Sequence, residues 1–178
     1  MTRRFGALGA TLLLVAFACA VSRPASAQRP GQPAQGADKR DRVVAAPGTP
    51  FNGKAYWQSA AQCGGIYFKV GTFYSEEAIK AQVIKPDPAA YEKFTRSAQG
   101  ATRNATAFFE AAERFLIADR KITREEAVLA YDPISTAAGD RAKTLDAALQ
   151  ATKPCPDLYQ TCRATYPQAC NDNDALAD

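Results

Sequence analysis

Histidine is absent from this chain of 178 residues, which also holds a single methionine and a single tryptophan. Without histidine the chain lacks the side chain that most often serves as general base or metal ligand. Phosphate-binding loops, dinucleotide fingerprints, nucleophile elbows and zinc motifs are missing too. We therefore expect no cofactor, no metal and no catalytic residue, and the sequence predicts a protein that is not an enzyme.

The first 27 residues predict a secretory signal peptide. Arg3 and Arg4 precede an apolar run over residues 5–21, and a small-x-small sequence ends at Ala27, where we expect cleavage. The run is marginal in length for a membrane span. The arginine pair also suits twin-arginine export, but the residues after it fit that signal poorly, which favours the general secretory route. The expected location is therefore periplasmic or secreted, without stable membrane insertion after cleavage.

Strong net charge is missing from the expected mature chain. Three of the 22 basic residues lie in the signal segment, which leaves 19 basic and 18 acidic residues. A nearly neutral protein has no electrostatic preference for the phosphates of nucleic acid. We therefore expect no nucleic-acid partner.

Four cysteines remain after the signal segment: Cys63, Cys155, Cys162 and Cys170. An even number in an exported chain predicts two disulfides, whereas a zinc site is disfavoured because no close Cys-x2-Cys pair is present. Three pairings are possible. We favour Cys63–Cys155 with Cys162–Cys170, because the second pair is local in sequence.

The expected mature chain divides into three parts by composition. Residues 28–53 are rich in proline, glycine and glutamine and predict a flexible leader. Residues 54–170 carry apolar residues at helical spacing and predict a helical domain. Residues 171–178 are acidic and predict a disordered tail.

The strongest helical pattern runs over residues 88–119, where apolar residues alternate in steps of three and four. Asp87 can cap this helix, and Pro88 suits its first position. A second pattern runs over residues 123–152 and begins with a Thr-x-x-Glu capping box. The short connection predicts an antiparallel pair whose apolar faces bury each other. The predicted fold class is all-α: a small antiparallel bundle with a long helical hairpin, held together by two disulfides.

Three boundaries are less clear from the residues. A first helix is expected from about Lys54, but the pair Gly64-Gly65 weakens it, and the sequence leaves open whether it breaks there. Ser75 followed by two glutamates predicts the start of a separate short helix. Pro133 predicts a kink or a split in the helix after residue 123.

Phe109 is the best single candidate for an interaction surface. Its neighbour Phe108 belongs to the apolar seam, so Phe109 must either pack on another element or be exposed. The paired carboxylates Glu125 and Glu126 are assigned to the start of a helix rather than to catalysis, since helix neighbours do not face each other.

The sequence thus predicts an exported bacterial cell-envelope protein that binds another macromolecule, such as another envelope protein, in an accessory or structural role. A small-ligand carrier with an apolar cavity is the alternative. A carboxylate- or tyrosine-based enzyme is less favoured, because no spacing points to a converging pair of ionisable side chains. No known family is recognised in these residues.

Overall fold

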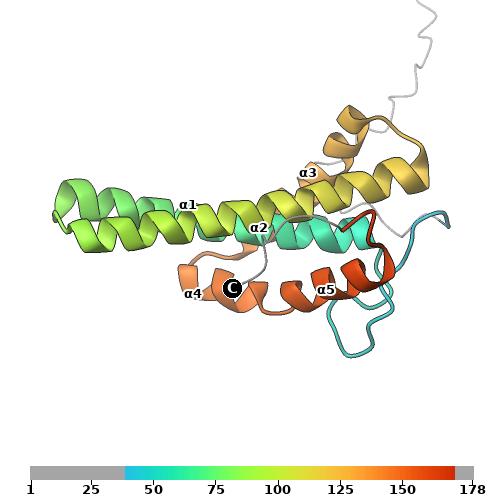
Figure 1. Ribbon diagram of the computed structural model, residues 1–178, viewed down its shortest axis with the longest axis horizontal. Coiled ribbons are helices and arrows are strands. Elements are labelled where there is room, and N and C mark those ends of the chain that lie inside the picture. Colours follow the sequence, from blue (N-terminus) through green and yellow to red (C-terminus); the bar gives the residue numbers. More distant parts are fainter. Residues whose placement is uncertain (1–38, 171–178) are drawn as a thin grey trace, which may run out of the picture. The chain divides into compact units, whose positions relative to one another are not determined.

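The computed structural model describes residues 39–170, and within this range it is a helical bundle (Figure 1). The elements are α1 (Tyr56–Ile79), the π-helical turn η1 (Lys80–Ile84), α2 (Pro88–Arg120), α3 (Arg124–Arg141), α4 (Leu145–Thr152) and α5 (Cys155–Thr165). The only β-type pairing in the described residues is an isolated bridge between Val43 and Ala55. The predicted all-α bundle is confirmed. The signal segment, residues 28–38 of the leader and the acidic tail lie outside the described residues.

Helix α1 is the centre of the bundle, because it contacts α2, α3, α4 and α5. It lies antiparallel to α2 along most of its length (Figure 1). Trp57 and Cys63 of α1 are buried in the main core with Phe108, Phe115 and Leu116 of α2. The sequence predicted that the helix after residue 123 would be the main partner of α2. In the structure, the main partner of α2 is instead α1.

Glycines explain how α1 reaches this central position. A Cβ on Gly65 would collide with the backbone of Ser135 in α3, and one on Gly139 would lie 2.9 Å from the Gly65 carbonyl oxygen. A Cβ on Gly64 would collide with the ring of Phe109. The helix runs unbroken through both glycines: Gly64 makes room for the Phe109 ring, and Gly65 with Gly139 lets α3 cross α1 in close contact.

The helix boundaries confirm some sequence signals and correct others. Asp87 caps α2, because its carboxylate accepts a hydrogen bond from the Ala90 N–H at 3.0 Å. Ser75 does not begin a new helix as predicted. Its hydroxyl instead donates to the Gly71 carbonyl at 2.9 Å, a bond that a serine inside a helix can make. Helix α1 therefore continues to Ile79 without a break.

The segment after residue 123 forms two helices rather than one. The capping box of Thr123 and Glu126 is present as predicted. Pro133 lies inside α3, and the helix is split later, at residues 142–144. There Ala142 is extended, and the Thr144 hydroxyl accepts from the Ala147 N–H and starts α4. A strong N-cap thus decides where the chain splits.

Both disulfides join the favoured partners. Cys63 in α1 bonds to Cys155 at the start of α5, across 92 residues. Cys162 in α5 bonds to Cys170, across 8 residues. The first bridge links α5 to α1 at the centre of the bundle. The second bridge links α5 to Cys170, the last described residue. Disulfides of this kind persist in oxidising, non-cytoplasmic compartments.

Residues 39–53 correct the prediction of a flexible leader up to residue 53. Val44 and Phe51 are buried in the main core. The Val44 N–H donates to the Lys54 carbonyl at 2.8 Å, and the Gly53 N–H donates to the Val44 carbonyl at 2.9 Å. This loop therefore belongs to the folded part, which begins earlier than Lys54. The polar composition of the segment predicts flexibility, but Val44 and Phe51 fix it to the core.

Candidate functional site

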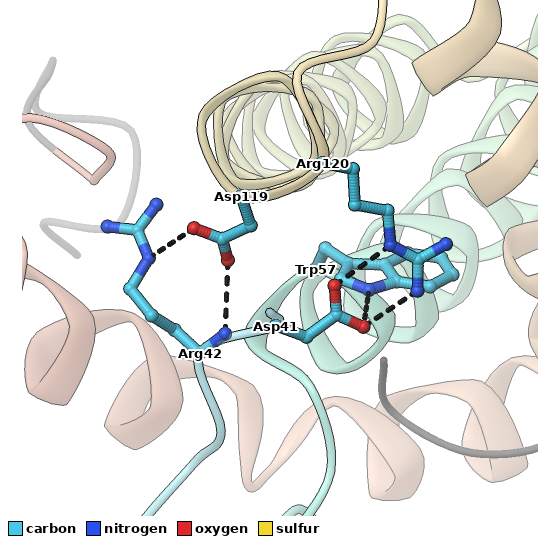
Figure 2. A network of polar contacts seen from close by, with 5 residues as sticks. All are labelled: Asp41, Arg42, Trp57, Asp119 and Arg120. Atoms are coloured by element: carbon cyan, nitrogen blue, oxygen red, sulfur yellow. Dashed lines mark hydrogen bonds and ion pairs between the residues drawn. The ribbon is translucent and has the colours of Figure 1, made fainter. Parts of the chain in front are cut away.

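A network of charged side chains fastens the N-terminal loop to the end of α2 (Figure 2). The Asp41 carboxylate is fully buried and accepts two hydrogen bonds from Arg120, at 2.8 and 2.7 Å. It also accepts a bond from the Trp57 indole N–H at 3.0 Å. Next to it, Arg42 donates to Asp119 through its side chain at 2.8 Å and its backbone N–H at 3.1 Å. We call these five residues the polar network.

Aromatic rings hold both arginines of the network in place. The Arg120 guanidinium lies 4.8 Å from the centre of the Trp57 ring. The Arg42 guanidinium lies 4.5 Å from the centre of the Phe115 ring and 5.0 Å from that of Tyr166. Each buried carboxylate is thus matched by an arginine that is itself packed on a ring. The arrangement suits an anchor of the loop, since every charge in it already has its partner inside the chain.

Glu125 and Glu126 serve the start of α3. The Glu126 carboxylate accepts from the Thr123 backbone N–H at 2.8 Å, which completes the capping box. Hydrogen bonds from its own backbone N–H and from the Thr123 hydroxyl lower the pKa of Glu125. Both carboxylates therefore stabilise the helix end. Within residues 39–170, no group of three or more metal-ligating side chains comes together.

Three tyrosines of the described chain have a pKa above the usual value, and for each of them burial is the main cause: Tyr56, Tyr67 and Tyr131. Near Tyr131 the charges of Glu113 and Asp132 add to the effect. Near Tyr67 a hydrogen bond with Thr152 opposes it. A raised pKa keeps these phenols protonated at neutral pH, the opposite of what a tyrosine acting as base needs.

Phe109, the interaction residue suggested by the sequence, packs against other helices of its own chain and is half-buried. Its ring stacks on Tyr131 of α3, with 5.5 Å between ring centres and 11° between ring planes. Its Cδ1, Cε1 and Cζ atoms lie against Gly64 of α1. Of the two alternatives for Phe109, the structure shows the first, packing on another element. The Phe109 ring is thus used to pack α2 against α1 and α3.

A groove between α1 and α2 offers a candidate interaction surface. It lies towards η1, beyond the point where α3 crosses α1, and has a volume of about 590 Å³. Its lining consists of small, apolar and polar side chains: Ser75, Ala78, Ile79, Gln82, Tyr91, Thr95, Ala98, Gln99, Thr102 and Arg103. We call it the α1–α2 groove. Figure 1 shows this end of the two helices without a third helix against it.

Large apolar side chains are exposed where the groove ends. The exposed fractions are 59% for Ile79, 69% for Val83 and 75% for Ile84. Tyr91 at the start of α2 is also exposed. We call these four residues the hairpin tip. Large apolar side chains exposed this close together are typical of interaction sites.

No known family, curated protein or solved structure matches this chain. The described residues also contain no helix that is both long and apolar enough to cross a membrane.

Sequence reasoning missed the hairpin tip for an identifiable reason. Val83 and Ile84 are apolar residues just before Lys85-Pro86, where the sequence predicted only the end of a short separate helix that starts at Ser75. Because α1 instead continues to Ile79 and turns through η1 directly into α2, these side chains lie at the end of a two-helix projection. Exposure of an apolar residue is a tertiary property that periodicity does not encode.

Proposed function

We propose that this chain is a non-catalytic protein of the bacterial cell envelope, periplasmic or secreted, that binds another macromolecule through the α1–α2 groove and the hairpin tip. The exposure of Ile79, Val83, Ile84 and Tyr91 at one end of two helices is the observation that carries this proposal. The two disulfides and the signal-like residues 1–27 support the compartment.

The shape of the groove favours a macromolecular ligand. Small side chains, among them Ser75, Ala78 and Ala98, form part of its lining, so the backbone of a partner can approach closely. Ile79 and Tyr91 also line the groove and supply the apolar and aromatic contact area that carries binding energy at protein interfaces. An amphipathic helix laid into a groove uses these features.

A small-ligand carrier remains the second candidate, because about 590 Å³ falls within the volume range of small-molecule sites. The groove lies between only two helices, whereas such sites usually enclose most of their ligand. Dye displacement with a solvatochromic apolar probe tests this candidate. Tight displacement by small apolar compounds, without any protein adduct at the groove, would favour the carrier over our proposal.

Site-specific photo-crosslinking in intact cells tests the proposal directly. A photoreactive residue at Ile79 is expected to give a discrete protein adduct. The same residue at Leu129, which is 75% exposed on α3 and outside the groove, is the matched control. Tyr91→Ala should weaken the Ile79 adduct, while circular dichroism shows an unchanged fold. Equal labelling at both positions, or none at Ile79, would contradict binding at the groove.

The compartment has its own test. Intact-mass analysis of the protein from envelope fractions should give a chain that begins at Gln28 and is four mass units lighter than its reduced form, as two disulfides require. Recovery from the cytoplasm with residues 1–27 retained would contradict export.

A further inference from the structure

The N-terminal loop contains an Asn-Gly pair, Asn52 and Gly53, and both residues are exposed. A Cβ on Gly53 would have no atom within 4 Å, so the space around it is open. Its φ of 76° lies in the left-handed region, which glycine adopts without strain. The Asn52 side chain is therefore accessible to water, and no side chain on the next residue blocks approach to the backbone nitrogen that follows it.

Asparagine before glycine can react with its own backbone. The Gly53 nitrogen attacks the side-chain carbon Cγ of Asn52 and closes a succinimide ring, an intramolecular step that needs no second reactant. The side-chain nitrogen leaves as ammonia and carries away the proton that the Gly53 nitrogen loses. Water then opens the ring at either of its carbonyl carbons. The products are aspartate or isoaspartate, in which the backbone continues through Cγ.

Two hydrogen bonds hold the reacting groups in the folded chain. The Gly53 N–H donates to the Val44 carbonyl at 2.9 Å, so the proton that must leave is already bonded to another oxygen. The Asn52 Oδ1 atom accepts from the Ala46 N–H at 3.1 Å, which holds the side-chain amide in place. Ring closure needs the Gly53 nitrogen to lose its proton and to approach Cγ. The bond to Val44 must therefore open first.

Buried side chains keep that bond closed. Phe51, directly before Asn52, is 5% exposed, and Val44 is 1% exposed. On the N-terminal side of Val44, Asp41 and Arg42 are bonded to the end of α2. Opening of the turn at Asn52 therefore takes apolar side chains out of the core. The frequency of such a local opening depends on the contacts that are lost in it.

We propose that Asn52 is a site of spontaneous deamidation whose rate is set by opening of the loop of residues 39–55. This reaction goes beyond the proposed binding function and does not depend on it. Isoaspartate adds one carbon to the backbone between Asn52 and Gly53. The turn from Phe51 to Lys54, which a bond from the Lys54 N–H to the Phe51 carbonyl closes at 3.0 Å, then contains an extra atom. Conversion to isoaspartate should therefore loosen the loop.

Peptide mapping by mass spectrometry tests the site on the mature chain, residues 28–178, during weeks at mildly alkaline pH. The peptide that contains Asn52 should gain the mass of an amide-to-acid conversion in the folded chain, roughly ten-fold or more slowly than in guanidinium chloride. Asn104 lies inside α2 before Ala105 and should stay unchanged in the folded chain, which makes it the internal control. Absence of conversion at Asn52 in the folded chain overturns the inference, as do equal rates in the folded and the denatured chain.

Variants that weaken the loop test the link to its opening. Asp41→Asn removes the charge that Arg120 contacts and should raise the rate at Asn52 by roughly ten-fold or more. Glu92→Gln breaks an exposed ion pair on α2 and should leave the rate unchanged. If circular dichroism shows that Asp41→Asn does not fold, Phe51→Leu replaces it, because it reduces the apolar anchor beside Asn52 and should act in the same direction. A folded variant of either kind that reacts at the wild-type rate overturns the inference.

Discussion

Replacement of Asp41 by asparagine should remove a large part of the stability of this protein. The substitution keeps the size of the side chain but removes the charge that Arg120 contacts at 2.8 and 2.7 Å. Asp41 is fully buried and the Arg120 side chain is 22% exposed, so the arginine regains only part of its hydration. Loss of one partner of a buried ion pair costs about 3–5 kcal/mol. The partial exposure of Arg120 sets our expectation near the lower end, about 3 kcal/mol.

Urea denaturation followed by circular dichroism and by fluorescence measures this loss. Trp57 is the only tryptophan of the chain, and its indole donates to Asp41, so its emission reports on the network itself. The midpoint of thermal unfolding should fall by about 6–12 °C, given about 2–4 °C per kcal/mol for chains of this size.

A second ion pair provides the control for the Asp41 variant. Glu92 and Arg96 form an exposed pair one helical turn apart, with side chains 67% and 70% exposed. Glu92→Gln should cost less than about 0.5 kcal/mol, as exposed helix pairs do. If Asp41→Asn costs no more than Glu92→Gln, the reasoning that burial makes the network stabilising is refuted.

Further outcomes follow from the disulfides, the glycines and the buried tyrosines. Replacement of both cysteines of the Cys63 bridge with serine should cost about 4.6 kcal/mol of stability, and the same change at the Cys162 bridge about 2.5 kcal/mol. These values follow from the chain-entropy model, because the bridges close loops of 92 and 8 residues. Equal losses of melting temperature in the two variants would contradict this order. Gly65→Ala should lower the melting temperature, because the new methyl group meets the α3 backbone. Gly100→Ala, where the nearest atom lies 3.9 Å away, should raise the melting temperature slightly. Equal effects of the two variants would argue against close packing of α1 and α3. Burial raises the pKa of Tyr67 above 10.0, so the free energy of unfolding should fall as the pH rises above about 10 and through the folded-state pKa. Urea titrations at several pH values measure this fall, and Tyr67→Phe should make it smaller. An unchanged pH dependence in the variant would contradict a contribution from Tyr67.

Local signals in the sequence predicted much of the bundle correctly. The cap at Asp87, the capping box at Thr123 and the local pairing of Cys162 with Cys170 each depend on residues close together in the chain. Such signals survive folding because few tertiary contacts compete with them. They gave the length of α2 and the start of α3.

Long-range contacts decided the features that the sequence did not predict. Ser75 resembles a cap but bonds back to Gly71, where α1 packs closely against α2, and the helix continues to Ile79. Asp41 belonged to a segment whose composition predicts flexibility, and only its distant partner Arg120 shows why it is ordered. The candidate binding surface was missed for the same reason. The exposure of the Val83 side chain depends on where α3 and α4 end, and no local sequence pattern predicts this.

The pairing of Asp41 with Arg120 has a consequence for the order of folding. The two residues are 79 positions apart, so the N-terminal loop cannot lock until α2 has been completed. A chain that emerges from a ribosome or a translocation channel N-terminus first must therefore carry residues 39–55 unsecured while the next 65 residues follow. Cys63 waits longer still, because its partner Cys155 lies 92 positions later. Its thiol remains available to oxidases or to wrong partners through most of the emergence of the chain, and the correct bond forms only near the end.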